Sequence, residues 1–132
     1  MSQENVEVVK TAFEAWNRGD LDGWLAEADP EIEWHALPDA PDPGPHRGRQ
    51  VVKERSALWR DTLGGFRAEV LEYIDAGECV IVPTRMRARP PGSDADVVLE
   101  EVYVSKFRDG KIVELREYRT KPEALEAVGL SE

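Results

Sequence analysis

The sequence predicts an α+β protein in which a curved antiparallel or mixed sheet carries N-terminal helices on its concave face. In the first half of the chain, apolar residues recur mostly at three- and four-residue spacing, which is typical of amphipathic helices. From residue 66 to residue 119 they alternate with a period of two, as in half-buried strands. Helices followed by a run of strands indicate helices packed on one face of a sheet. A length of 132 residues suits a single domain over residues 1–132.

Two helices are predicted at the start of the chain. Residues 3–18 place Phe13 and Trp16 on the same apolar helical stripe as two valines and an alanine, and Gly19 follows. Asp20 can cap a second, short helix, and Pro30 lies just beyond its expected end. These two segments predict a helical hairpin.

A short strand, a stiff loop and a third helix come next. Residues 31–35 alternate weakly, and residues 36–45 contain four prolines that exclude regular structure and predict a surface loop. After Gly48, apolar residues recur with helical period as far as Leu63, and Gly64 and Gly65 end the segment. The proline-rich loop is expected to form a rim beside the open end of the curved sheet.

Four antiparallel strands are predicted between residues 66 and 119. Three turn signals separate them, at residues 75–78, 90–93 and 109–110. Asp109 and Gly110 give the sharpest of these signals, because a two-residue hairpin needs positive φ at both central positions. Thr120 begins a capping box, so a short helix is expected to close the chain.

Composition excludes several classes of function. A formal net charge of −10 disfavours binding to nucleic acid. The sequence contains no apolar run long enough to cross a membrane and no basic and apolar leader, and its only cysteine is Cys79, so a cytoplasmic protein is expected. Neither a phosphate-binding glycine loop nor a metal-ligand spacing is present, so no cofactor and no metal are expected.

Glu117 is the candidate catalytic residue that the pattern itself singles out. With Val113 and Leu115 it lies on one face of the last strand, so a carboxyl group follows two apolar side chains toward the core. A carboxyl group in such a place is either paired or has a raised pKa, and a raised pKa suits a general acid or base near neutral pH. The alternative is a structural ion pair with one of three arginines, Arg85, Arg87 and Arg119.

Further candidate ligand contacts lie on neighbouring elements. Leu99, Glu101 and Tyr103 share one face of the preceding strand and can reach the same cavity. Phe13, Trp16, Trp34 and Trp59 are expected to line or support it, although aromatic residues at such spacing are more often part of a core. A cavity with these walls suits a small hydrophobic molecule.

Arginine and histidine candidates are less well placed by alternation. Arg85 and Arg87 share a strand face with Ile81, so the period of two directs them away from the apolar side. His35 falls on the face opposite Trp34, which favours a structural role, and His46 is expected in the solvated loop.

The order of elements resembles the SnoaL-like family of the nuclear transport factor 2-like superfamily, also described as cystatin-like. Four segments carry the resemblance, namely residues 12–20 (AFEAWNRGD), 33–34 (EW), 108–113 (RDGKIV) and 116–118 (REY). The resemblance covers nearly the whole chain and implies a cone-shaped sheet with an internal pocket. The group includes polyketide cyclases, ketosteroid isomerase and limonene epoxide hydrolase, so it indicates the fold better than the activity.

The resemblance to the epoxide hydrolase can be followed residue by residue. Trp34 stands at the position of its tyrosine and Ala36 at that of its asparagine, so both groups that hold the attacking water are absent. Glu117 retains the final-strand acid and Arg85 the arginine, but Arg87 replaces the second acid. This register implies that Arg85 and Arg87 point into the cone, where Arg85 would hold negative charge on oxygen and Arg87 would contact the substrate.

The sequence leaves two main functions open, and a third is an adaptor that acts through an exposed apolar patch on its sheet face. One is an acid/base isomerase, cyclase or hydrolase acting on a polyketide-, terpene- or steroid-like molecule, with Glu117 moving the proton. The other is a non-catalytic binding or dimeric interaction module of the same fold. A homodimer through the sheet is implied by the resemblance and supported by an apolar stripe on one strand face, formed by Val98, Val102 and Val104.

Overall fold

Four helices, of which two are short, pack against a single sheet in the computed structural model, which describes residues 2–130. The helices are α1 (Ser2–Asn17), α2 (Leu21–Leu25), α3 (Arg49–Thr62) and α4 (Lys121–Ala127). The strands are β1 (Ala28–His35), β2 (His46–Arg47), β3 (Phe66–Val70), β4 (Ile74–Asp75), β5 (Cys79–Ala88), β6 (Val97–Arg108) and β7 (Lys111–Tyr118). Within residues 2–130, no helix combines the length and the hydropathy that a bilayer-spanning segment needs.

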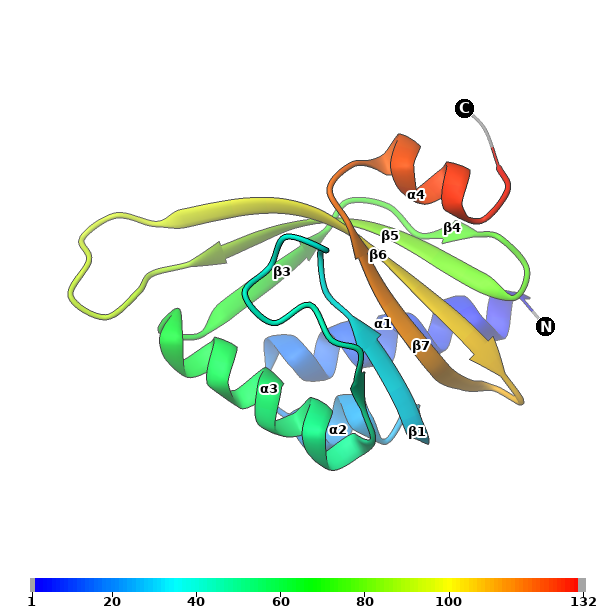
Figure 1. Cartoon of the computed structure of the whole chain (residues 1–132), viewed down its shortest axis with the longest axis horizontal. Helices are drawn as coiled ribbons and strands as arrows, with labels where there is room; N and C mark the ends of the chain where they lie inside the picture. The colour runs from blue at the N-terminus through cyan, green and yellow to red at the C-terminus, as the bar shows by residue number, and fades with distance from the viewer. Residues whose placement is uncertain (1, 131–132) are drawn as a thin grey trace.

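The seven-stranded sheet is mixed and curved. Its strand order is β2-β1-β7-β6-β5-β3, and β4 pairs with β5. β1 runs parallel to β7, whereas the other pairings are antiparallel. The long strands β5 and β6 form a projecting hairpin that extends beyond β7, and β3 pairs with the outer part of β5 (Figure 1). This α+β architecture with a curved, open sheet confirms the predicted fold class.

Local signals in the sequence located most elements correctly. Asp109 and Gly110 have φ values of 53° and 78° in the β6–β7 turn, and the Thr120 side chain accepts a hydrogen bond from the backbone N–H of Glu123 at the start of α4. The prediction of four strands after residue 66 was wrong, because the two-residue strand β4 adds a fifth. Strand β1 also begins earlier than predicted, at Ala28, and includes Pro30 beside an irregularity in its pairing with β7.

The sheet has an apolar core on each face. On the concave face, the helices α1 and α2 pack against a cluster that includes Val80 and Val82 of β5. On the convex face, α4 packs its Ala124 and Leu125 against a second cluster. Figure 1 shows α4 separated by the sheet from α1, α2 and α3. The two faces of one strand therefore bury apolar side chains in two different layers.

The predicted apolar dimer stripe needs a correction. Val102 and Val104 are buried beneath α4, with exposed fractions of 4% and 5%, so they do not require a second chain to cover them. The sequence argument failed because it left α4 unplaced, and this helix covers the convex face locally. Val98 lies beyond α4 on the projecting hairpin and is 46% exposed. The homodimer itself stays a prediction.

Candidate functional site

A cavity of about 450 Å³ lies between the helices and the concave face of the sheet. Its apolar walls come from α1, α2, α3, the proline-rich loop and four strands, and its polar groups gather on the sheet and on α3. The apolar and aromatic residues are Val9, Ala12, Phe13, Trp16, Trp24, Trp34, Leu37, Ala40, Trp59, Leu63, Met86, Leu99, Tyr103, Ile112 and Leu115. The polar residues are Arg55, Glu100, Glu101, Ser105, Glu117 and Arg119.

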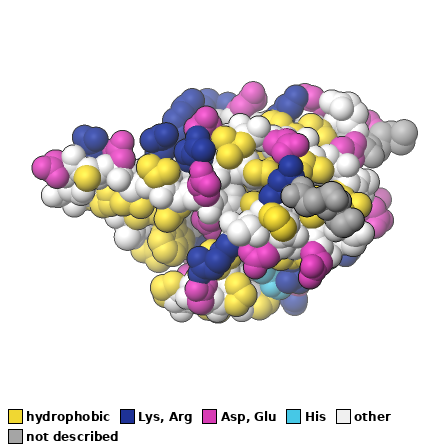
Figure 2. All heavy atoms as spheres, turned by 90° about the horizontal axis from the view of Figure 1, so that it is seen from above, with side chains coloured by type: hydrophobic (Ala, Val, Ile, Leu, Met, Phe, Trp, Pro, Cys, Tyr) yellow, Lys and Arg dark blue, Asp and Glu magenta, His cyan; other side chains and the backbone are white. Residues whose placement is uncertain are grey.

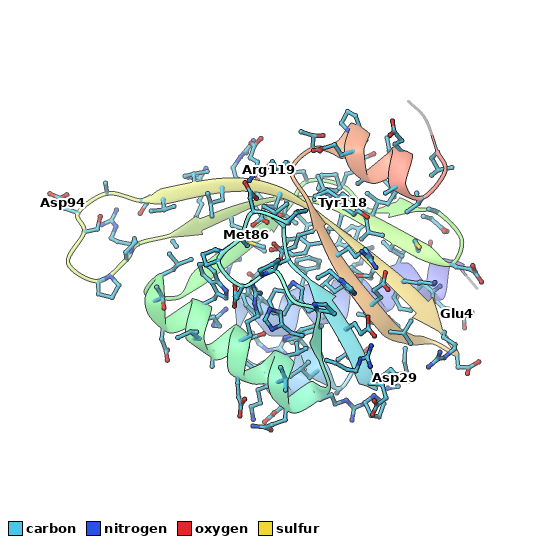
Figure 3. The ribbon with its side chains drawn as sticks, viewed as in Figure 1. Glu4, Asp29, Met86, Asp94, Tyr118 and Arg119 are labelled. Carbon is cyan, nitrogen blue, oxygen red and sulfur yellow. The ribbon has the colours of Figure 1, made fainter. Side chains whose placement is uncertain are left out.

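Periodicity accounts for the way these side chains converge. Phe13 and Trp16 are three residues apart on α1 and so occupy one helix face, and the Phe13 ring meets the Tyr103 ring of β6 edge to face at 6.1 Å. Met86 of β5 and Arg119, which follows β7, approach the cavity from two further segments (Figure 3). A volume of this size accommodates a small multi-ring molecule.

Glu117 of β7 is the most chemically distinctive group in the cavity. The indole Nε1 of Trp34 on β1 donates a hydrogen bond of 2.6 Å to its Oε2. The pairing of β1 with β7 brings the two strands together, and Glu117 makes no salt bridge within residues 2–130. Glu101 approaches Glu117 from β6, so two carboxyl groups interact in a mainly apolar cavity.

This environment favours the protonated form of Glu117. Burial, followed by the hydrogen bond and the negative charge of Glu101, raises the pKa of Glu117 from 4.5 to about 8, against the opposing effects of Trp34 and the Arg55 charge. Burial, with Glu117 and Glu101 nearby, also raises the pKa of the Tyr103 phenol well above its usual value. At neutral pH the cavity therefore holds a neutral phenol and a carboxyl group close to its titration range.

Sequence reasoning missed Arg55, a cation that lines the same cavity. Its side chain is only 6% exposed, and its guanidinium carbon lies 4.4 Å from the centre of the Trp34 ring and 5.7 Å from that of Trp59. Nε and Nη2 donate to the two carboxylate oxygens of Asp42 at 3.1 and 3.2 Å. The signal was available, since Arg55 lies on the same helical stripe as Val52 and Trp59.

The proline-rich loop lies over the cavity and is tied down at two points. Asp42 pairs with the buried Arg55, and Asp39 pairs with Arg119, which follows β7. The loop also contributes Leu37 to the cavity wall. The expected rim is therefore part of the wall. The hydrogen bonds that Arg55 donates are the main reason that the pKa of Asp42 lies below its usual value.

The predicted inward orientation of Arg85 and Arg87 was wrong. Arg85 lies outside the cavity, where it donates to Glu100 at 3.0 Å and approaches Glu69 at 3.6 Å, and Arg87 is exposed. The reason is the uninterrupted pairing of β5 with β6, which keeps the period of two and turns Met86 inward. Simple alternation was the better guide at this strand.

Alternation failed at one position in β7. The pairing with β6 shifts between Lys106 and Phe107, which inserts an extra residue in β7 near Val113. As a result Ile112, and not Val113, lines the cavity beside Leu115. Glu117 lies beyond this bulge, so its position relative to Leu115 follows the expected period.

The other predicted ligand contacts line the cavity as a group. These residues are Phe13, Trp16, Trp34, Leu99, Glu101 and Tyr103. Leu99 belongs to its outer edge, since it is 45% exposed. Contact with a ligand stays a prediction for each of them.

Both histidines lie outside this cavity. His35 approaches Glu33 at 3.0 Å on the convex face, as its alternation with Trp34 predicts. With Glu114 these two residues form a compact group of possible metal ligands, but the two carboxylates already pair with Arg47 and Arg116. His46 is not a solvated loop residue, because it belongs to β2 and its ring contacts the carbonyl oxygen of Asp42 at 2.8 Å.

Comparison with known proteins identifies the family of the chain that forms this cavity. The family model of the SnoaL-like domain matches residues 9–115. The chain belongs to the SnoaL-like family. The match spans α1 through most of β7 and therefore includes most of the cavity wall of this SnoaL-like domain. No curated protein matches the sequence significantly.

Solved structures confirm the nuclear transport factor 2-like fold of the SnoaL-like domain. Bal32a from a soil-derived mobile gene cassette is similar with a TM-score of 0.80 and 24% identity, over 89% of each chain. TerC, co-crystallised with polyporic acid, gives a TM-score of 0.79 and 23% identity over 95% of this chain and 98% of its own. A nuclear transport factor 2-like protein from Burkholderia pseudomallei gives a TM-score of 0.77 and 23% identity, over 96% of this chain and 98% of its own. The SnoaL-like fold is consistent with a small-molecule-binding protein.

Proposed function

We propose that the protein is an acid/base enzyme that transfers a proton on a small hydrophobic molecule, with Glu117 as the catalytic residue. The observation that carries the proposal is the environment of this carboxyl group. It lies in an apolar cavity, holds no salt bridge within residues 2–130 and has a pKa raised to about 8. A base of this kind is strong when ionised and accessible near neutral pH.

The neighbouring groups have distinct roles in this proposal. Trp34 orients the Glu117 carboxyl group through the hydrogen bond from its indole N–H to Oε2. Glu101 raises the pKa of Glu117 and is positioned to exchange the proton with it. Tyr103 stays protonated and so can donate a hydrogen bond to a developing negative charge on substrate oxygen. The aromatic wall binds the apolar body of the substrate.

A ring-containing substrate of the polyketide, terpene or steroid kind fits this proposal. The wall contains tryptophans from α1, α2, α3 and β1, which offer broad apolar faces. The co-crystallisation of the structural neighbour TerC with polyporic acid gives a precedent for a bound organic molecule on this fold. Isomerisation, cyclisation and hydrolysis each begin with a proton transfer that Glu117 can perform.

A general-base test does not require the natural substrate. Nitrobenzisoxazole loses its ring proton to a base while its N–O bond breaks and the electron pair moves to oxygen, releasing a coloured cyanophenolate. We expect turnover by the wild type to rise with pH and reach half its maximum near pH 8. Glu117→Gln is expected to lower the rate at least about a hundredfold. A matched control is Glu114→Gln, on the same strand but the opposite face.

The alternative is a binding protein that uses the same cavity without turnover. The small apolar side chain of Ala36, where the related hydrolase has a water-holding amide, favours it over a hydrolase. Under this alternative, nitrobenzisoxazole turnover equals that of free acetate at the same carboxylate concentration, and Glu117→Gln does not lower it. That outcome would overturn the catalytic proposal.

We further propose that the chain acts as one domain, in the cytoplasm, as a homodimer. The exposed Val98 of the β5–β6 hairpin supports an interface there, in place of the stripe that α4 covers. A molar mass in solution equal to that of one chain, at all concentrations up to the millimolar range, would contradict the dimer.

A further inference from the structure

Arg55 is a buried cation whose hydrogen-bonding capacity is only partly used. Its guanidinium lines the cavity, and both of its hydrogen bonds, from Nε and Nη2, go to Asp42. Within residues 2–130, Nη1 donates to no protein group. A guanidinium has five N–H donors in a fixed planar arrangement, so this buried side chain keeps donors for another partner.

Contacts with three residues fix the direction of the Arg55 guanidinium. The guanidinium carbon lies 4.4 Å from the centre of the Trp34 ring and 5.7 Å from that of the Trp59 ring. Both carboxylate oxygens of Asp42 accept hydrogen bonds from the guanidinium. Stacking and a bidentate ion pair together hold a planar side chain in one orientation. Arg55 is also close enough to affect the pKa values of Glu117 and Tyr103, so it shares the polar end of the cavity with them.

We propose that Arg55 is a positioning residue that donates a hydrogen bond from Nη1 to an uncharged oxygen, such as a carbonyl oxygen, on an otherwise apolar ligand. The inference deepens the proposed function and rests on it, because it names the substrate class of the same cavity. Arg55 thereby places the oxygen of the ligand at the end of the cavity where Glu117 transfers the proton.

The charges around the cavity explain why the oxygen is uncharged. Asp42 neutralises the Arg55 charge, and two of the acidic side chains that line the cavity, Glu101 and Glu117, lie at the same end. A carboxylate ligand would add a further negative charge to a desolvated site with no surplus of positive charge, which is costly. A neutral carbonyl group avoids this cost and still accepts a hydrogen bond from the guanidinium.

A matched series of three probes tests this inference by calorimetry at neutral pH. Acetylnaphthalene carries an uncharged oxygen, ethylnaphthalene has the same shape without it, and naphthoate carries a full negative charge. We expect the wild type to bind acetylnaphthalene about tenfold more tightly than ethylnaphthalene, and naphthoate most weakly. Arg55→Met is expected to remove the preference for acetylnaphthalene while ethylnaphthalene binds as before.

Asp42→Asn provides a second test that does not remove the buried arginine. Because it leaves the Arg55 charge uncompensated, it is expected to tighten naphthoate binding at least about tenfold, with little change for ethylnaphthalene. Each of three results would overturn the inference. Naphthoate could bind most tightly to the wild type, or Arg55→Met could lower the affinity for all three probes equally. The third is an unchanged naphthoate affinity in Asp42→Asn.

Catalysis by Glu117 and ligand positioning by Arg55 are measured separately. Glu117→Gln is expected to stop nitrobenzisoxazole turnover and to leave the preference for acetylnaphthalene intact. If turnover proves independent of Glu117 while Arg55→Met still removes the preference, catalysis by Glu117 is wrong and the positioning role of Arg55 stands.

Discussion

Carboxyl groups have different partners on the two faces of the sheet, and two glutamates of strand β7, three positions apart, show the difference. Glu114, on the convex face, pairs with Arg116 at 2.6 Å. Glu117, on the concave face, has a tryptophan N–H and a second carboxyl group as its partners. Figure 2 shows acidic and basic side chains interspersed over the one face of the molecule that it views. The same residue type is thus a surface ion-pair partner on one face and a proton-transfer candidate on the other.

The pKa values follow from this difference. On the convex face, hydrogen bonds from His35 and Arg47 lower the pKa of Glu33, and the Glu114 partner raises that of Arg116. On the concave face, burial raises the pKa of Glu117 to about 8. Charged partners stabilise the ionised form, whereas an apolar wall destabilises it. The comparison teaches that facing, and not residue type, decides which acid is available for chemistry.

The largest expected effect concerns stability and pH at Glu117. Its pKa is about 8 in the folded protein, against 4.5 ordinarily. Between these values the folded state holds a proton that the unfolded chain has released, so the wild type loses stability as pH rises from about 4.5 to about 8. The loss amounts to about 4 kcal/mol at the top of this range.

Glu117→Gln is expected to abolish this loss, because glutamine does not ionise. The variant should therefore equal the wild type near pH 5 and exceed it in stability near pH 8, as measured by denaturant unfolding at both pH values. A variant that is less stable than the wild type by about 2 kcal/mol or more at pH 8 would show that a buried ion pair holds ionised Glu117, and the two faces of the sheet would then not differ in this respect.

An intermediate effect is expected when the hydrogen bond to Glu117 is removed. The Trp34 N–H lowers the pKa of Glu117, so Trp34→Phe should raise that pKa further, by about one unit. The pH at half-maximal nitrobenzisoxazole turnover measures the shift. Trp59→Phe is the matched control, because Trp59 lines the same cavity and donates no hydrogen bond to Glu117 within residues 2–130. An equal shift in both variants would assign the effect to packing.

The smallest effect is expected on the convex face. Glu114→Gln removes a partly solvated ion pair with Arg116, and such pairs contribute less than about 1 kcal/mol. Its stability should stay within that range of the wild type at neutral pH and should respond weakly to added salt. A loss comparable to the effect at Glu117 would remove the distinction between the two faces.

The agreement between sequence and structure varies with the type of signal used. Period and turn chemistry located α1, α3, α4 and the β6–β7 turn, because these depend on residues adjacent in the chain. Alternation also placed Glu101, Tyr103 and Glu117 on the cavity side. It failed at Val113, where an extra residue in one strand shifts the period, and the register taken from the resemblance failed at Arg85.

The sequence by itself determined the fold class, the family and the presence of an acid among apolar residues on the last strand. Only the tertiary structure decided what surrounds that acid. The partners of Glu117 come from β1 and β6, and the Arg55–Asp42 pair joins α3 to the proline-rich loop. Local periodicity specifies which face a side chain occupies, but the pKa and pairing of a buried group depend on segments that only packing brings together.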